Sequence, residues 1–181
     1  MTTSLDQAST QSVDTGSHAV VPSPPVVCTT KNETRDQLLA VTRSAERQLT
    51  IWSADLNAGL FENPAFLEAL KRFVLARRHA RVRLLTSNLP PTAEHRHALL
   101  AMADRLPASI EVRTIEHAPV DASELVLADE RGVLYRIHAD RWDSMASTND
   151  PLVARFYLSQ FDTAWRTMAS STGTYEELAE V

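Results

Sequence analysis

The densest polar cluster of the sequence lies just before its last predicted helix and contains Tyr135, Arg136, Asp140 and Arg141. Two guanidinium groups this close together could hold an anion by paired hydrogen bonds, because their planar donors match a carboxylate or a phosphate. They could equally pair with the nearby carboxylates of Asp140, Asp143 and Asp150 and fix the loop before the helix. The sequence leaves both interpretations open, and we favour the ion pairs.

Ser53 and Asp55 form a second candidate for ligand binding, at the end of the apolar run Gln48–Ser53. Such a run is typical of a buried strand, and ligands in α/β proteins gather at the carboxyl ends of strands. The two side chains could therefore bind a polar ligand. The simpler interpretation, which we favour, is that Asp55 caps a loop and that Ser53 satisfies backbone groups.

His97 and Asp129 would complete a Ser–His–Asp set with Ser53, but the sequence lacks the Gly-x-Ser-x-Gly turn of such hydrolases and has only four glycines. Asp129 is followed by Gly132, and this composition is typical of a hairpin turn. His95 and His97 are too close in sequence to share one face of a predicted helix. We therefore predict no metal site and no cofactor.

The overall charge argues against a non-specific nucleic-acid binder, because the formal net charge is -5. We therefore do not expect nucleic acid as a partner. A basic strip nevertheless runs from Lys71 to Arg83, through the end of a predicted helix and into the next strand. Cations complement the negative end of a helix dipole, so we interpret the strip as ordinary surface and leave local binding of RNA, DNA or an acidic partner open.

The single cysteine, Cys28, cannot form an internal disulfide, which favours a reducing, cytoplasmic setting. No run of apolar residues approaches the ~18 that a membrane span needs, so we predict none. Residues 1–25 are rich in Ser, Thr, Gln and Pro and are expected to form a disordered tail, and residues 171–181 a flexible one. One domain is then expected over residues 26–170.

The hydrophobic pattern alternates strands with helices in the first half of the chain and predicts a β-hairpin in the second. Strands are expected over 26–29, 48–53, 80–86, 109–115, 125–128 and 133–137. Helices are expected over 32–47, 64–77, 92–106 and from 151 onward, with caps at Asn32, Asn63, Thr92 and Asp150. The last helix should turn Leu152, Phe156, Phe161 and Trp165 towards the core. These elements predict an α/β sandwich, with a mixed sheet and helices on both faces.

The order of these elements resembles a phospholipase D-like domain over about residues 32–170. It resembles more narrowly a bacterial family of unknown function, a degenerate phospholipase D-like domain that is sometimes fused to a GNAT-type acetyltransferase. The residues that carry the resemblance are Ser53, Asp55-Leu56, His97, Leu99, Arg105-Leu106-Pro107, Leu127-Ala128-Asp129, Tyr135-Arg136, Ala139-Asp140-Arg141, Asp150-Pro151, Phe161 and Trp165.

The resemblance implies that the catalytic motif of this fold is lost. In the active domains a strand carries a His, a Lys two residues later and an Asp five residues after the Lys. Aligned on Asp129, the first two positions hold Ala122 and Glu124. A methyl group replaces the nucleophile, and a carboxylate replaces the cation that neutralises the phosphate.

We therefore expect a non-catalytic phospholipase D-like module for binding or interaction. Its candidate ligand-binding residues are Ser53, Asp55, His97, Asp129, Tyr135, Arg136, Asp140 and Arg141. Since such units usually bury the site-bearing face against a second copy, one unit implies a homodimer, and an acetyltransferase partner would act in trans. The alternative is an enzyme that uses these residues on a phosphate-containing or other anionic substrate. Convergence of their side chains on one pocket would favour that enzyme.

Overall fold

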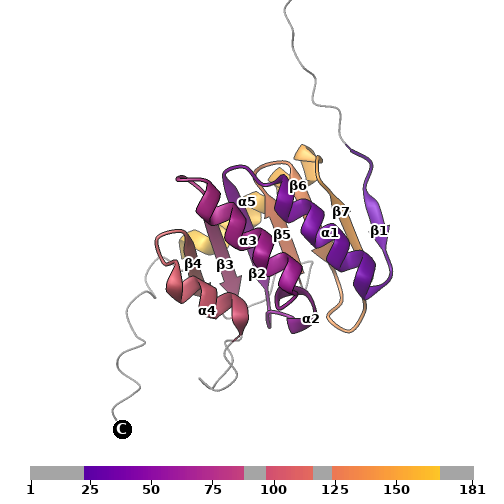
Figure 1. Cartoon of the computed structure of the whole chain (residues 1–181). Coiled ribbons are helices and arrows are strands. Elements are labelled where there is room, and N and C mark those ends of the chain that lie inside the picture. The colour runs from indigo at the N-terminus through magenta and orange to yellow at the C-terminus, as the bar shows by residue number, and fades with distance from the viewer. Residues whose placement is uncertain (1–22, 88–96, 116–123, 168–181) are drawn as a thin grey trace, which may run out of the picture.

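The computed structural model describes residues 23–87, 97–115 and 124–167, which form one seven-stranded sheet with helices on both faces (Figure 1). The strands are β1 (Val26–Cys28), β2 (Gln48–Ser53), β3 (Arg81–Thr86), β4 (Ile110–Thr114), β5 (Glu124–Ala128), β6 (Gly132–Arg136) and β7 (Ser144–Ser147). The helices are α1 (Lys31–Ser44), α2 (Ala58–Phe61), α3 (Pro64–Ala76), α4 (Ala98–Arg105) and α5 (Pro151–Thr167). The expected fold class is confirmed.

The sheet has the strand order β1-β7-β6-β5-β2-β3-β4, and its strands begin and end at two opposite edges. Strands β2, β3 and β4 are parallel, and β5 runs antiparallel to β2, so that β5 begins where β2 ends. We call this the Ser53 edge, after the last residue of β2. The opposite edge, where β2 begins and the β5–β6 turn lies, is the Asp129 edge. Helices α1, α3 and α4 cover one face, and α5 covers the other (Figure 1).

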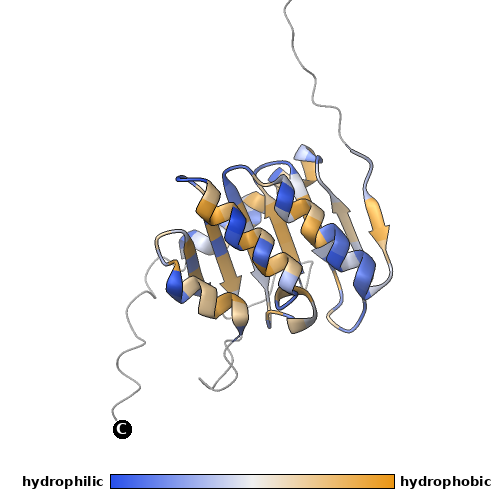
Figure 2. Ribbon diagram, in the orientation of Figure 1, coloured by the Kyte–Doolittle hydropathy of each residue, from blue (hydrophilic) through white to orange (hydrophobic). Residues whose placement is uncertain are grey.

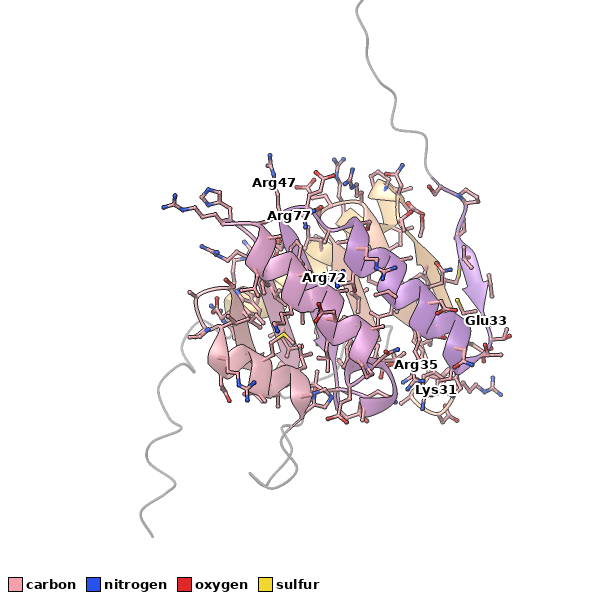
Figure 3. The ribbon with its side chains drawn as sticks, viewed as in Figure 1. Lys31, Glu33, Arg35, Arg47, Arg72 and Arg77 are labelled. Carbon is pink, nitrogen blue, oxygen red and sulfur yellow. The ribbon has the colours of Figure 1, made fainter. Side chains whose placement is uncertain are left out.

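The cap of α1 lies two residues earlier than the sequence predicts, because Thr30 caps the helix and not Asn32. The Thr30 hydroxyl accepts the N–H of Glu33, and the Glu33 carboxylate accepts the N–H groups of Thr29 and Thr30, at 2.9 and 3.0 Å. These bonds, with Thr29 the largest contributor, hold the pKa of Glu33 below its ordinary value. Glu33 lies at the start of α1 in Figure 3. The predicted cap at Asn63 is confirmed, and Thr92 lies outside the described residues.

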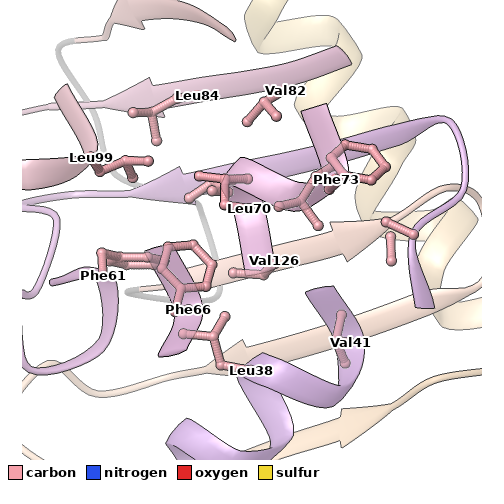
Figure 4. Close-up of a cluster of buried hydrophobic side chains, with 14 of the residues drawn as sticks. Leu38, Val41, Phe61, Phe66, Leu70, Phe73, Val82, Leu84, Leu99 and Val126 are labelled. Atoms are coloured by element: carbon pink, nitrogen blue, oxygen red, sulfur yellow. The ribbon is translucent and has the colours of Figure 1, made fainter. Parts of the chain in front are cut away.

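The main hydrophobic core lies between the sheet and the helices α1, α3 and α4. Figure 2 shows strongly hydrophobic central strands and helices with alternating hydrophobic and hydrophilic bands. The side chains that meet in this layer include Leu38, Val41, Phe61, Phe66, Leu70, Phe73, Val82, Leu84, Leu99 and Val126 (Figure 4). Side chains from β2, β5 and β6 pack in this layer, which stabilises the arrangement of these neighbouring strands.

Helix α5 supplies the second core layer, but with a different face from the one predicted. Phe161 and Trp165 are buried as expected, whereas Leu152 and Phe156 are 83% and 57% exposed. Ala154, which is fully buried, marks the inward face. Leu152 and Phe156 each lie two positions from Ala154, a rotation of about 200° around the helix, so they point away from the sheet.

Candidate functional site

Polar side chains form one row across the sheet at the Ser53 edge. Ser53 is opposite Glu124 on β5, and Glu124 is opposite Arg136 on β6. Directly opposed residues on neighbouring strands point to the same face, which here is the one covered by α1 and α3. The row continues through Thr86, Thr114, Ser144 and Cys28. The structure therefore places Ser53 and Arg136 in one row, with Glu124 between them.

Glu124 and Arg136 form a buried, bidentate ion pair at the centre of this row. Nε of Arg136 donates to one oxygen of Glu124 at 2.5 Å, and Nη2 donates to the other at 2.7 Å. Both side chains are almost fully buried. Two parallel charge-assisted bonds fix the orientation of both groups, and a buried pair of this kind is strongly destabilised when one partner is removed.

The same guanidinium group holds the loop between β6 and β7. Nη1 of Arg136 donates to the carbonyl oxygens of Ala139 and Arg141, at 3.0 and 2.6 Å. The guanidinium carbon lies 4.8 Å from the centre of the Trp142 ring, within cation–π range. The Thr34 hydroxyl on α1 lies 3.1 Å from the Trp142 carbonyl oxygen. An exposed loop is thus tied to the core at three of its backbone carbonyls.

Arg136 does not form the ion pairs with nearby aspartates that we favoured from the sequence. Its carboxylate partner is Glu124, and neither Asp140, Asp143 nor Asp150 forms an ion pair with it. Asp140 and the Arg141 side chain are exposed on the loop. The densest polar cluster of the sequence is therefore divided between a buried ion pair and a solvent-facing loop.

Ser53 and His97 lie near the same edge, each engaged with a backbone group. The Ser53 hydroxyl accepts the N–H of Leu56 at 3.1 Å, in a turn where Leu56 has φ 50°. His97 is the N-cap of α4, and its Nδ1 accepts the N–H of Leu99 at 3.2 Å. Asp55 is exposed. The interpretation of Ser53 as a residue that satisfies a backbone group is confirmed.

The imidazole of His97 is buried. Burial lowers the pKa of His97 from 6.5, and this effect outweighs the nearby Glu62 carboxylate and a backbone contact with Leu56, which both act in the opposite direction. Nε2 is buried and has no hydrogen-bond partner among the described residues. Ser87, which follows β3 at the same edge, likewise has a buried hydroxyl oxygen without a hydrogen-bond partner among the described residues.

Asp129 lies at the opposite edge and has a structural role. Its carboxylate accepts the backbone N–H groups of Glu46, Arg47 and Gln48, each at 2.8 Å. Asp129 itself has φ 53°, the left-handed conformation that Asp tolerates in turns. Its assignment to a hairpin turn is confirmed, and the side chain fastens the connection between α1 and β2 to that turn. It does not meet Ser53, His97 or Arg136.

Tyr135 points to the other face of the sheet. Its hydroxyl lies 2.9 Å from the sulfur of Met145, and its ring centre lies 5.4 Å from that of Tyr157 on α5. Tyr135 and Arg136 therefore do not form one cluster, because successive residues of a strand face opposite sides of the sheet. Among the described residues, no group of three His, Cys, Asp or Glu side chains is arranged to hold a metal ion.

We did not predict that Glu124 pairs with Arg136, although the sequence contains the information needed to place them opposite each other. In the β5–β6 hairpin Ala128 is opposite Gly132, so stepping outward by equal numbers pairs Glu124 with Arg136. Once the turn at Asp129 is recognised, this register follows. No comparable sequence signal marks Thr34 or Trp142, because they come from separate elements that only tertiary packing brings to the loop.

Comparison with solved structures supports the phospholipase D-like fold. TrmBL2, an archaeal chromatin protein whose structure shows a novel mode of DNA binding, aligns with 83% of the chain at TM-score 0.57 and 14% identity. NucT from Helicobacter pylori aligns with 79% of the chain at TM-score 0.57 and 12% identity, and the alignment covers 96% of NucT. Nuc from Salmonella typhimurium, a phospholipase D family member, aligns with 79% of the chain at TM-score 0.53 and 17% identity, and the alignment covers 95% of Nuc.

These likenesses show a shared fold and no more, because the identities are low. The chain spans 55% of TrmBL2. None of the curated proteins matches the chain. Within the described residues, none of the helices is long and apolar enough to cross a membrane. A family model for a domain of unknown function (DUF7931) matches residues 30–175, so the chain belongs to that family.

Proposed function

We propose that the chain is a non-catalytic phospholipase D-like domain that acts as a binding or interaction module. The observation that carries this proposal is the buried ion pair between Glu124 and Arg136. The resemblance to the active domains puts a phosphate-binding lysine where this chain has Glu124. Here the carboxylate neutralises the neighbouring guanidinium and would repel a phosphodiester.

The state of Arg136 supports the same proposal. An anion could reach its Nε and Nη2 only by displacing Glu124, which would leave a buried carboxylate without its partner. Breaking a buried ion pair of this kind costs about 3–5 kcal/mol. The active-domain nucleophile would stand at Ala122, which has no nucleophilic group. Ser53, the hydroxyl directly opposite Glu124 on the row, accepts a backbone N–H instead.

We further propose that the module contacts its partner through the loop 137–143. Asp140 and Arg141 are exposed there, while the loop's backbone is tied to Arg136 and Thr34. A preorganised loop loses less conformational entropy on binding. A GNAT-type acetyltransferase supplied as a separate chain is the partner that the family resemblance implies. Co-purification of that enzyme with the wild type, and not with Asp140→Arg/Arg141→Glu, tests this part.

An assay of phosphodiester hydrolysis tests the absence of catalysis. The full chain is incubated with bis(p-nitrophenyl) phosphate, and release of nitrophenolate is expected to equal the rate in buffer alone. Ser53→Ala and the matched surface variant Ser159→Ala, on α5, serve as controls. Turnover that persists in Ser159→Ala and disappears in Ser53→Ala would establish a catalytic site at the Ser53 edge. The proposal would then be wrong.

The enzyme alternative remains the second hypothesis because of one observation, the buried imidazole of His97, whose Nε2 has no hydrogen-bond partner among the described residues. The candidate residues as a set do not support it, since Asp129 and Tyr135 lie elsewhere. The fold likeness to a DNA-binding chromatin protein weakens our expectation that nucleic acid is not a partner. A cytoplasmic location stays a prediction.

A further inference from the structure

Seven exposed cations gather at the Asp129 edge, although the chain as a whole is acidic. Helices α1 and α3 both lead into parallel strands, so their carboxyl ends come together where β2 and β3 begin. Figure 3 shows Arg47 and Arg77 at this edge, Arg72 further back along α3, and Lys31 far from the edge. We call the whole set the basic rim: Arg43, Arg47, Lys71, Arg72, Arg77, Arg78 and Arg81.

A groove runs through the rim between α1 and α3. It has a volume of about 470 Å³, and its charged lining consists of Arg43, Arg72, Arg77 and Glu68. Glu68 pairs with Arg72 at 2.9 Å, and both side chains are exposed. Three guanidinium groups against one carboxylate leave the groove with a net positive charge.

The rest of the rim is also uncompensated. Apart from Arg72, no member forms an ion pair with a described residue. The nearby Glu46 carboxylate is engaged by Arg131 at 2.5 Å. Cations in the last turn of a helix complement its dipole, but that effect decays within one turn and does not account for Arg47, Arg78 or Arg81.

A neighbouring pocket beside Asp129 and α5 also contains arginines, but most of them are paired with carboxylates. It has a volume of about 670 Å³ and four guanidinium groups in its lining. Three of them are paired with carboxylates, at Arg131–Glu46, Arg155–Glu130 and Arg83–Asp162. The fourth belongs to Arg47 of the basic rim. The pocket is therefore nearly neutral, and the positive excess lies on the α1–α3 side.

From this arrangement we propose that the basic rim binds the sugar-phosphate backbone of duplex DNA without reading its sequence. Six of its seven cations are arginines, whose planar donors match phosphate oxygens. Among the exposed large hydrophobic side chains, only Leu75 lies on this part of α3, so a protein partner would find few apolar anchors.

Two further features favour duplex DNA over other nucleic acids. Single-strand binding relies on exposed aromatic rings on which bases stack, and Phe73, the aromatic ring in the groove, is buried. Duplex RNA is recognised through contacts with its 2′-hydroxyl groups, and Thr42, the neutral polar residue in the groove, is buried and donates its hydroxyl to Leu38. The rim offers phosphate contacts alone.

The rim lies at the opposite edge from Glu124 and Arg136, so this inference stands independently of the proposed absence of catalysis. Fluorescence anisotropy of the full chain with a labelled duplex of about 20 base pairs, at about 50 mM salt, measures the affinity. Binding is expected, and the logarithm of the association constant should fall linearly as the logarithm of salt concentration rises. Arg77→Glu/Arg78→Glu should weaken binding at least about tenfold and make the salt slope shallower by about 2.

The matched control is Lys31→Glu/Arg166→Glu, which changes the net charge equally but lies outside the rim. It should retain wild-type affinity within about twofold, because its sites contact no phosphate. Thermal melting of both variants excludes unfolding as the cause. No binding by the wild type, or equal loss in the two double variants, would overturn the proposal. Tighter binding of single strands, of duplex RNA or of poly-glutamate would replace duplex DNA with that ligand.

Discussion

Glu124 and Arg136 stand directly opposite each other on β5 and β6, and their side chains join in a bidentate ion pair with both charges out of solvent. The pair closes the open end of a hairpin whose turn is built around Asp129. Arg136 extends the same fixation to the loop that follows β6. The two buried charges thus hold the hairpin and its loop together.

Removing one partner of the pair should be more damaging than removing both. Glu124→Ala or Arg136→Ala removes one partner of the buried ion pair, and each should lower the free energy of unfolding by about 3–5 kcal/mol. Glu124→Leu/Arg136→Met removes both charges while it keeps much of the volume. It should cost less than either single change. Urea denaturation measures all three, and additive losses would show that the two groups do not act as a pair.

Asp129→Ala should destabilise the fold, because the Asp129 carboxylate holds the connection between α1 and β2. Three backbone N–H groups lose their acceptor, two of them partly compensated by water, so we expect a loss of about 2–3 kcal/mol. Asp129→Asn keeps one acceptor oxygen and tolerates the positive φ, so its loss should be smaller. The midpoint of urea denaturation measures both losses. An unchanged midpoint in Asp129→Ala would contradict the structural role of the Asp129 carboxylate.

The elements with strong local signals were predictable from the sequence. Asn63 followed by Pro64 gives a cap and a first-turn proline, and α3 begins there. The turn at Asp129 and Gly132 fixes the β5–β6 hairpin, because the chain must reverse there. Ser53, at the end of β2, does lie on the polar row. Each of these features depends on neighbours in the sequence.

The features that were missed depend on tertiary packing. Strand β7 reads Ser-Met-Ala-Ser and has no apolar run, yet it is a strand because β6 and β1 pair with it on both sides. The inward face of α5 could not be told from its outward face, since apolar residues occur on both. Likewise, the ties from Thr34 and Trp142 to the loop follow from the way α1 crosses β7.

His97 should make stability depend on pH. Its folded pKa is lowered below 6.5 by burial, so the unfolded chain binds the proton more readily. Stability from this group is therefore complete above pH 6.5 and falls as the pH drops towards the lowered folded pKa. Protonation would also remove the Nδ1 acceptor that caps α4.

The variant that isolates this effect is His97→Asn, which keeps an acceptor for the Leu99 N–H and does not titrate. Urea midpoints at about pH 7.5 and about pH 5.5 should differ more for the wild type than for the variant. Equal differences in the two proteins would assign the pH dependence to other groups.

The last prediction concerns the homodimer that the resemblance implies. Leu152 and Phe156 on α5 are 83% and 57% exposed and lie one turn apart. Helix α5 begins beside the β5–β6 turn, where the N–H of Asp150 donates to Arg131, so this apolar pair lies near the Asp129 edge and not on the site-bearing edge. We predict a twofold dimer through this pair, because both copies of each side chain would be buried, which stabilises the dimer by about 1.5–3 kcal/mol per side chain.

Analytical ultracentrifugation should show a dimer for the wild type and a monomer of unchanged melting temperature for Leu152→Lys/Phe156→Lys. Leu75→Lys, at another exposed apolar residue on α3, should remain dimeric. A monomeric wild type, or dissociation by Leu75→Lys as well, would remove α5 as the interface.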